Sequence, residues 1–212
     1  MQILLANIDV PLNNREWLKG RFTELRTKTN EEEQLEGIRE ILDYTNPGPG
    51  GFYDDLGRVT AQPHLVPGRS YEEDPQYFAS PLMAFGCRPG DRQSWCDYAD
   101  GVWGYEVKLH YRNLDPEGRY RVRIVYAGRL RAFAYEMADR SRLGQPVTVR
   151  LTGDGTEIHP RIPKPDPVEP VEFDVPVELT RDGALTLGCT GAVGIDGPPR
   201  GCQIAEIWLM KR

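Results

Sequence analysis

The chain has 212 residues, with 26 Lys and Arg against 32 Asp and Glu, and a formal net charge of -6. This length is sufficient to bury a core in one large or two small domains. The acidic balance disfavours sequence-independent binding of nucleic acid, which depends on an excess of Lys and Arg, and no apolar run approaches the roughly 18 residues that a membrane-spanning helix needs. We therefore expect neither nucleic acid nor a membrane among the partners.

Residues 1–45 are predicted to form a helical lead. Asn13 and Asn14 can cap a first helix, and a second is expected to begin near Asn30. Apolar residues recur at helical spacing in both segments: Leu18, Phe22 and Leu25 in the first, and Leu35, Ile38 and Leu42 in the second. The prolines and glycines of TNPGPGG, residues 45–51, are incompatible with helix and mark the domain boundary.

Residues 51–212 are predicted to form an antiparallel β-sandwich. The stretch from Gly51 to about Gly101 has no sustained period and is expected to be mostly loop, with any short strands in it left unassigned. After it, apolar and polar residues alternate in segments that predict seven strands, at 105–112, 120–127, 147–151, 156–162, 171–175, 184–189 and 203–210. Asp154-Gly155 lies between two of these strands and is a strong hairpin signal. Many short strands with frequent turns are typical of a sandwich.

The cysteines and the first residues bear on the cellular compartment. Cys87 and Cys96 form one sequence-local pair, and Cys189 and Cys202 form another. Two disulfide loops and four buried thiols both remain open, and neither spacing suits a zinc site. The first residues have no basic segment ahead of a long apolar run, as a secretory signal would. The chain can be cytoplasmic, or extracellular or periplasmic if it belongs to a longer secreted protein.

Three phrases stand out among the predicted strands: LDPEGRYRVRIVY at 114–126, DGALTLGCT at 182–190 and GCQIAEIWLM at 201–210. In their order and spacing they resemble galactose-binding-like and malectin-like β-sandwich modules, which occur as accessory domains of bacterial carbohydrate-active enzymes. The resemblance covers about residues 50–212. It implies a jelly-roll fold that binds a glycan, usually without catalysis and often with a structural calcium ion near the chain ends. The helical lead and the insertion at 131–144 depart from the usual small module.

A calcium site is a candidate feature of FYDDLG, residues 52–57. Asp54 and Asp55 offer the hard oxygen ligands that calcium requires. Glu206 matches the position that supplies a ligand in the calcium-bearing modules that the chain resembles. The alternative is that both aspartates solvate a turn and that Glu206 pairs with an arginine.

Aromatic residues in the loops are the candidate glycan site. Sugars present apolar C–H faces flanked by hydroxyl groups, so their sites need an aromatic platform with hydrogen-bonding side chains beside it. The segment at 91–104 offers this combination. The candidate ligand-binding residues are Trp95, Tyr98, Arg92, Asp97, Tyr53 and His64. The alternative for the aromatic residues is burial in the sandwich core.

The favoured function is a non-catalytic module that binds a polysaccharide or oligosaccharide, as part of or partner to a polysaccharide-degrading enzyme. One alternative is a polysaccharide hydrolase or lyase that uses carboxylate or His residues such as Asp55 or His64. The sequence contains no GxSxG nucleophile turn, no HExxH and no phosphate-binding glycine loop. Another alternative is a structural domain that packs on a catalytic domain of a longer chain, for which a large exposed apolar patch would be the signature.

Overall fold

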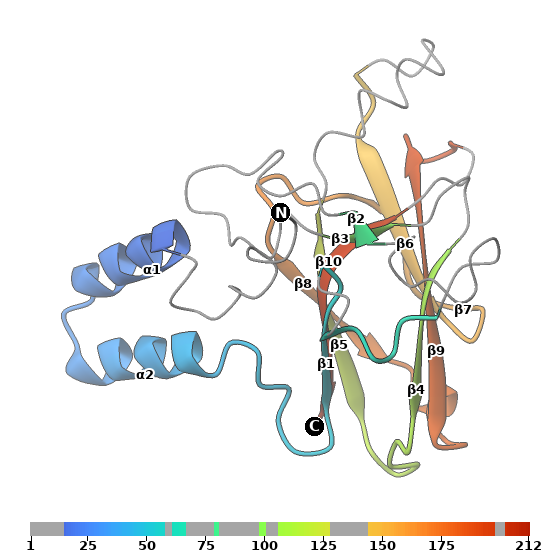
Figure 1. Ribbon diagram of the computed structural model, residues 1–212, viewed down its shortest axis with the longest axis horizontal. Helices are drawn as coiled ribbons and strands as arrows, with labels where there is room; N and C mark the ends of the chain where they lie inside the picture. Colours follow the sequence, from blue (N-terminus) through green and yellow to red (C-terminus); the bar gives the residue numbers. More distant parts are fainter. Residues whose placement is uncertain are drawn as a thin grey trace, which may run out of the picture.

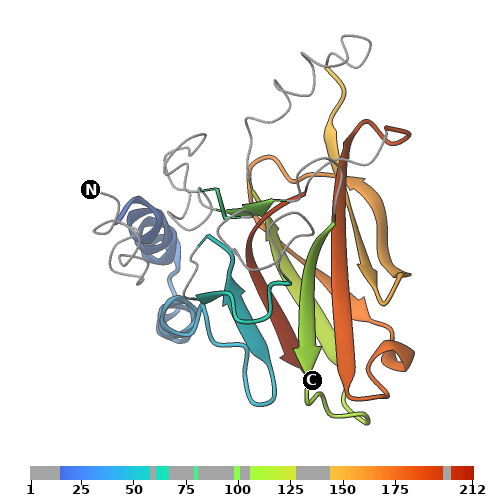
Figure 2. The ribbon, with the colours of Figure 1, turned by 45° about the vertical axis from the view of Figure 1, so that its right-hand side comes forward.

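The protein is mainly β, and its two antiparallel sheets face each other as a β-sandwich (Figures 1 and 2). The computed structural model describes residues 15–57, 61–66, 79–80, 98–100, 106–127, 144–197 and 202–212. The two helices lie together outside one sheet, apart from the interface between the sheets (Figure 1). No helix in these ranges is long and apolar enough to span a membrane.

The first sheet has six strands in the order β2-β3-β10-β5-β8, with β1 also paired to β10. Its strands are β1 (Phe52–Asp55), β2 (Ala79–Ser80), β3 (Tyr98–Asp100), β5 (Tyr120–Tyr126), β8 (Pro170–Val175) and β10 (Gln203–Lys211). The second sheet has four strands in the order β4-β9-β6-β7. These are β4 (Val107–Arg112), β6 (Val147–Gly153), β7 (Thr156–Pro163) and β9 (Ala184–Val193). A short 3-10 helix, Val177–Leu179, follows β8.

All seven strands predicted from alternation are present, and the sandwich prediction is confirmed. Asp154 and Gly155 both have positive φ, 49° and 82°, in the turn between β6 and β7, as the hairpin signal requires. The sequence did not identify β1, β2 or β3. These strands have two to four residues each, too few for a period of two to stand out.

The main core lies between the sheets and is built from the inward residues of the long strands. Its fully buried members include Val122, Ile124, Ile204, Ile207 and Leu209 from the six-stranded sheet, and Leu109, Leu151, Leu185 and Leu187 from the four-stranded sheet. Burying one such side chain contributes about 1.5–3 kcal/mol, so these facing rows drive the association of the sheets.

A disulfide bond joins the two sheets. Cys189 lies in β9, Cys202 immediately precedes β10, and their sulfur atoms are bonded. Of the two possibilities that the sequence left open for this pair, the structure therefore has the disulfide. Cys87 and Cys96 lie outside the described residues.

The helical lead consists of α1 (Arg15–Thr27) and α2 (Glu31–Leu42), with Asn30 Oδ1 accepting a hydrogen bond from Glu32 N–H at the start of α2. The helices touch where α2 has Gly37, because a Cβ there would lie 2.2 Å from a methyl carbon of Leu25. The buried face of α2 is formed by Gly37 and Ile41. The apolar stripe read from the sequence lies outside this face: Leu35, Ile38 and Leu42 are exposed.

A buried hydrogen bond between Tyr126 and His159 also connects the two sheets. The Tyr126 hydroxyl on β5 lies 2.6 Å from Nε2 of His159 on β7, and His159 Nδ1 lies 2.7 Å from the Pro160 carbonyl oxygen. The His159 ring stacks on Phe173 of β8. The carbonyl can only accept, so Nδ1 carries the proton and Nε2 accepts from Tyr126. This arrangement requires a neutral His159.

Acidification is therefore expected to weaken the fold through His159. Burial lowers the pKa of His159, against smaller raising effects of the Pro160 carbonyl and Glu157. The unfolded chain then binds its proton at higher pH than the folded chain. The stability from neutral His159 is present above the ordinary pKa of about 6.5 and is lost as pH falls toward the lowered value. Denaturant unfolding measured from about pH 7.5 to about pH 5.5 should show this loss, with a shallower slope in His159→Phe. Equal slopes in the two proteins would contradict it.

Candidate functional site

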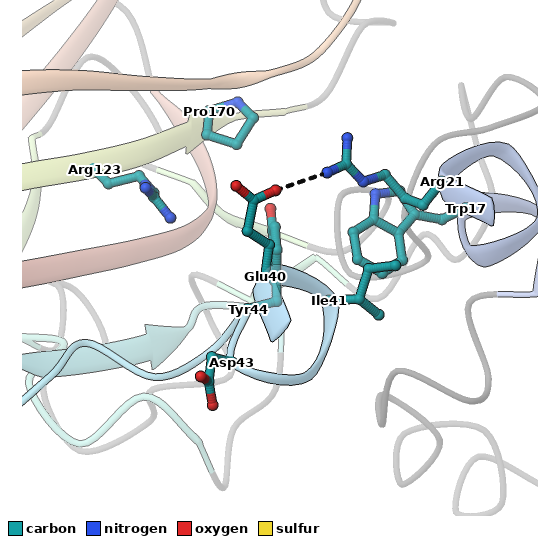
Figure 3. Close-up of a pocket in the computed structure, with 8 residues that line it drawn as sticks. All are labelled: Trp17, Arg21, Glu40, Ile41, Asp43, Tyr44, Arg123 and Pro170. Atoms are coloured by element: carbon teal, nitrogen blue, oxygen red, sulfur yellow. Dashed lines mark hydrogen bonds and ion pairs between the residues drawn. The ribbon is translucent and has the colours of Figure 1, made fainter. Parts of the chain in front are cut away.

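A cavity of about 470 Å³ lies between the helical pair and the outer face of the six-stranded sheet (Figure 3). We call it the helix–sheet cavity. Its lining residues are Trp17 and Arg21 from α1, Glu40 and Ile41 from α2, Asp43 and Tyr44 just after α2, Arg123 from β5 and Pro170 from β8. The volume falls in the range of about 300–1,000 Å³ that is usual for small-molecule sites.

Aromatic rings form the base of this cavity. The Trp17 and Tyr44 rings meet edge to face at 5.2 Å, and Tyr44 in turn packs edge to face on Trp208 of β10 at 5.4 Å. Trp208 also donates a hydrogen bond from Nε1 to the Tyr44 carbonyl oxygen at 3.1 Å. Tyr53 of β1 completes the row against Trp208 at 5.0 Å. This aromatic row connects the helical pair to the sheet, and two of its members, Trp17 and Tyr44, line the cavity.

Charged groups of both signs border the cavity. Arg21 Nη2 lies 3.2 Å from Glu40 Oε2, and Figure 3 shows this pair between the two helices with the Glu40 carboxylate toward the sheet. On the sheet side, Arg123 Nε donates to Glu172 Oε1 at 2.7 Å, and its guanidinium lies over the Trp208 ring at 5.8 Å from the centroid. The two arginines are thus held by carboxylates, Arg21 by Glu24 and Glu40 and Arg123 by Glu172, and Asp43 adds a further acidic side chain to the lining.

The structure describes three of the six predicted ligand-binding residues. Tyr98 is 4% exposed and packs in the cluster around Trp208, so its ring presents no open face. Tyr53 is half-buried beside Trp208, and its hydroxyl donates to Glu206 Oε1 at 2.7 Å. His64 contacts Asp54, whose side chain lies on the opposite face of β1 from that of Tyr53. The other three, Trp95, Arg92 and Asp97, lie outside the described residues. Glycan binding by this set stays a prediction.

His64 belongs to a buried hydrogen-bonded cluster around Asp54. The Asp54 carboxylate is fully buried and accepts from His64 Nδ1 at 2.9 Å, from the His64 backbone N–H at 3.2 Å and from the Tyr111 hydroxyl at 3.1 Å. The His64 ring stacks on Tyr111 and meets Phe52 edge to face. Burial, and then the Asp54 charge, raise the pKa of Tyr111 well above its ordinary value, so Tyr111 remains a donor.

The Asp54 cluster has the geometry of an oriented histidine. Because Asp54 accepts a hydrogen bond from Nδ1–H, the lone pair of a neutral His64 is on Nε2, and the His64 side chain is 22% exposed. An imidazole held in this way can act as a general base. This is the specific form that the hydrolase or lyase alternative takes in the structure.

The three predicted calcium ligands do not converge. Asp55 and Glu206 are cross-strand partners in β1 and β10 and share one face of the sheet, whereas Asp54 points to the other face, toward Tyr111. Within the described ranges, no group of three or more His, Cys, Asp or Glu side chains is placed to hold a metal ion. The trio therefore does not fit one calcium ion, and calcium binding by the chain stays a prediction.

Comparisons with known proteins identify no family. A scan against protein-family models and a search of the curated proteins both found no match. Solved structures with a similar arrangement include the plant receptor-like kinase ANX1 (10% identity, TM-score 0.46), the β-glucuronidase of Bacteroides uniformis (8%, 0.42) and a Bacillus subtilis protein (12%, 0.37). Each match covers 76% of this chain, but only 48%, 18% and 40% of those chains respectively. The chain thus spans less than half of each, and similarities this low carry no argument about its function.

Sequence reasoning missed the residues of the helix–sheet cavity. Trp17 and Arg21 lie in the predicted helical lead, and Arg123 is on the polar face of a correctly predicted strand. Arg21 and Arg123 are 102 positions apart in the sequence, and only the docking of the helices on the sheet brings them together. The one signal of this site in the sequence was Trp17, a large aromatic residue in the first turns of a largely polar helix.

Proposed function

We propose that this chain is a non-catalytic carbohydrate-binding accessory module and that the helix–sheet cavity holds part of the glycan. The observation that carries the proposal is the lining of the cavity, where the half-buried Tyr44 lies among hydrogen-bonding side chains and packs on Trp17, which is 7% exposed. The strand phrases that resemble galactose-binding-like modules support the same class of function.

The chemistry of the lining suits a neutral sugar. Aromatic rings favour the apolar C–H faces of a pyranose, while carboxylates and guanidinium groups accept from and donate to its hydroxyl groups. Both arginines are already paired with carboxylates, so the lining offers no unpaired positive group to select an anionic ligand. The apolar side chains of Ile41 and Pro170 complete the concave surface.

The test is a binding screen of the purified chain against plant, algal and bacterial polysaccharides, followed by Arg21→Ala. Arg21 contributes a charged donor at the cavity, and losing such a hydrogen bond costs about 1.5–3 kcal/mol, so binding should weaken about 10- to 100-fold. Arg39→Ala is the matched control, because Arg39 is 68% exposed on α2, pairs with Glu36 and does not line the cavity. Equal affinity of the two variants would contradict the location of the site.

Additional measurements in the same screen distinguish a different glycan site, a calcium-dependent module and an enzyme. Loss of binding in Trp95→Ala, with Arg21→Ala unaffected, would place the glycan on the predicted loop site instead. Binding that disappears with a chelator and returns with calcium would support a calcium-dependent module. Reducing ends or unsaturated products, absent after His64→Ala, would replace the binding role with a hydrolase or lyase.

A second candidate function, a structural domain that packs on a neighbour, is favoured by the outer face of the helical pair. Large apolar side chains are exposed on it: Phe22, Leu35, Ile38 and Leu42, the last at 71%. A screen in which no polysaccharide binds would favour this candidate, with a catalytic domain of a longer chain as the partner.

A further inference from the structure

The four-stranded sheet carries two neighbouring arginines at an irregularity between β6 and β7. Val149 pairs with Ile162 and Leu151 pairs with His159, so two residues of β7, Pro160 and Arg161, lie opposite the single residue Arg150. A bulge of this kind changes the direction of a side chain and often lies near a functional site. Here it places Arg150 and Arg161 opposite each other on adjacent strands.

The charges at the bulge are not balanced. Arg150 Nε donates to Glu157 Oε2 at 3.1 Å, and both of these side chains are largely exposed. Nη1 of Arg161 is buried from solvent, and among the residues that the structure describes no acceptor lies within hydrogen-bonding distance of it. Burial, and then the charge of Arg150, lower the pKa of Arg161, which nevertheless remains protonated because guanidinium does not lose its proton in proteins.

An unpaired buried N–H on a charged group is unfavourable in the free protein. A bound oxyanion would remove this cost in two ways, by accepting from Arg161 Nη1 and by screening the repulsion between Arg161 and Arg150. Planar carboxylates and tetrahedral sulfates both match the donor geometry of guanidinium. We propose that Arg161 and Arg150 form a binding site for an oxyanion, such as the carboxylate or sulfate group of an acidic saccharide or a free inorganic anion.

This site is separate from the helix–sheet cavity. It lies on the four-stranded sheet, whereas the cavity lies against the six-stranded sheet. The oxyanion site can therefore exist whether or not the cavity binds a glycan.

The first test measures the thermal unfolding of the protein with inorganic sulfate and with chloride at matched ionic strength. Sulfate should raise the midpoint more in the wild-type protein than in Arg161→Gln, which keeps only the general stabilisation by sulfate exclusion. Arg112→Gln is the matched control, since Arg112 is exposed on β4 at the opposite edge of the same sheet, and it should respond like the wild type. An equal response of Arg161→Gln and the wild type would overturn the proposal.

The stability of the anion-free variant is a second readout. Arg161→Gln removes a buried donor without a partner and the repulsion from Arg150, so its midpoint in chloride should equal or exceed that of the wild type. A clearly lower midpoint would mean that the guanidinium supports the fold, and would count against a binding role.

The source of the oxyanion is identified with polygalacturonate and its methyl-esterified form. Binding of the acidic form alone, weakened at least tenfold by Arg161→Gln but not by Arg21→Ala, would assign the site to an acidic saccharide. A response to sulfate without binding of polygalacturonate would assign it to a small free anion. The proposal that the helix–sheet cavity binds a glycan would then be decided separately, by the effect of Arg21→Ala on polysaccharide binding.

Discussion

Replacing Trp208 by alanine is expected to lower the free energy of unfolding by about 3–5 kcal/mol and to release the helical pair from the sheet. Trp208 is fully buried and contacts Tyr44 and Tyr53 through its ring. Its Nε1–H also donates to the Tyr44 carbonyl oxygen at 3.1 Å, which directly fixes the chain that follows α2. The substitution removes the aromatic row at its centre and leaves a cavity between the sheet and the chain that follows α2.

The two consequences are measured separately. Denaturant unfolding gives the loss of stability, and hydrogen exchange of residues 15–43 reports the release of the helices. Trp208→Phe is the matched variant, because it keeps a buried ring and removes the indole N–H, so it should lose less stability than Trp208→Ala. Unchanged exchange protection of the helices in both variants would show that they are held by other contacts. Because the helix–sheet cavity depends on this docking, Trp208→Phe should also weaken any glycan binding there.

Replacing Asp54 by alanine is expected to have a cost of similar size, about 3–5 kcal/mol, because it removes the shared acceptor of a buried hydrogen-bonded cluster, and each buried donor left unsatisfied costs about 1–3 kcal/mol. Three donors would lose their acceptor at once: the backbone N–H of His64, His64 Nδ1 and the Tyr111 hydroxyl. Tyr111 is completely buried, so water cannot replace the lost carboxylate without opening the core. The connection between β1, the 61–66 segment and β4 should loosen as a result.

Denaturant unfolding of Asp54→Ala and Asp54→Asn measures this effect. The amide of Asn keeps an acceptor oxygen without the charge, so the loss in Asp54→Asn should be smaller. Asp174→Ala is the surface control: its carboxylate is 73% exposed and pairs with Arg121, and such pairs contribute only about 0–1 kcal/mol. If Asp54→Ala cost no more than Asp174→Ala, the cluster would not be a stabilising unit. If the protein proved to cleave polysaccharide, the orientation of His64 by Asp54 would be the first feature to examine in these variants.

The class of the fold could be predicted from the amino-acid sequence, because alternation within a strand is a local property. In β4 and β5 every second residue is apolar, and those residues are the ones buried between the sheets. The turn between β6 and β7 could also be predicted from local sequence, because Asp-Gly favours the positive φ that a two-residue hairpin needs, and Asp154 and Gly155 adopt it. Helices α1 and α2 followed in the same way from spacing and from the capping residue Asn30.

Which side chains come into contact depends on the tertiary structure. Leu35, Ile38 and Leu42 form a stripe by spacing, yet α2 turns Gly37 and Ile41 inward, because the absence of a side chain at Gly37 lets Leu25 approach. The spacing of residues along a helix shows which of them share a face, but not which face packs against another element.

The same distinction applies to the candidate sites. Asp54 and Asp55 are adjacent in sequence, and this suggested a shared metal ion, but neighbouring residues of a strand point to opposite faces. Asp54 therefore meets His64 and Tyr111, while Asp55 lies beside Glu206. The helix–sheet cavity and the Arg150–Arg161 pair also arise from docking and from strand register. Those depend on contacts between distant residues, which no local pattern in the sequence contains.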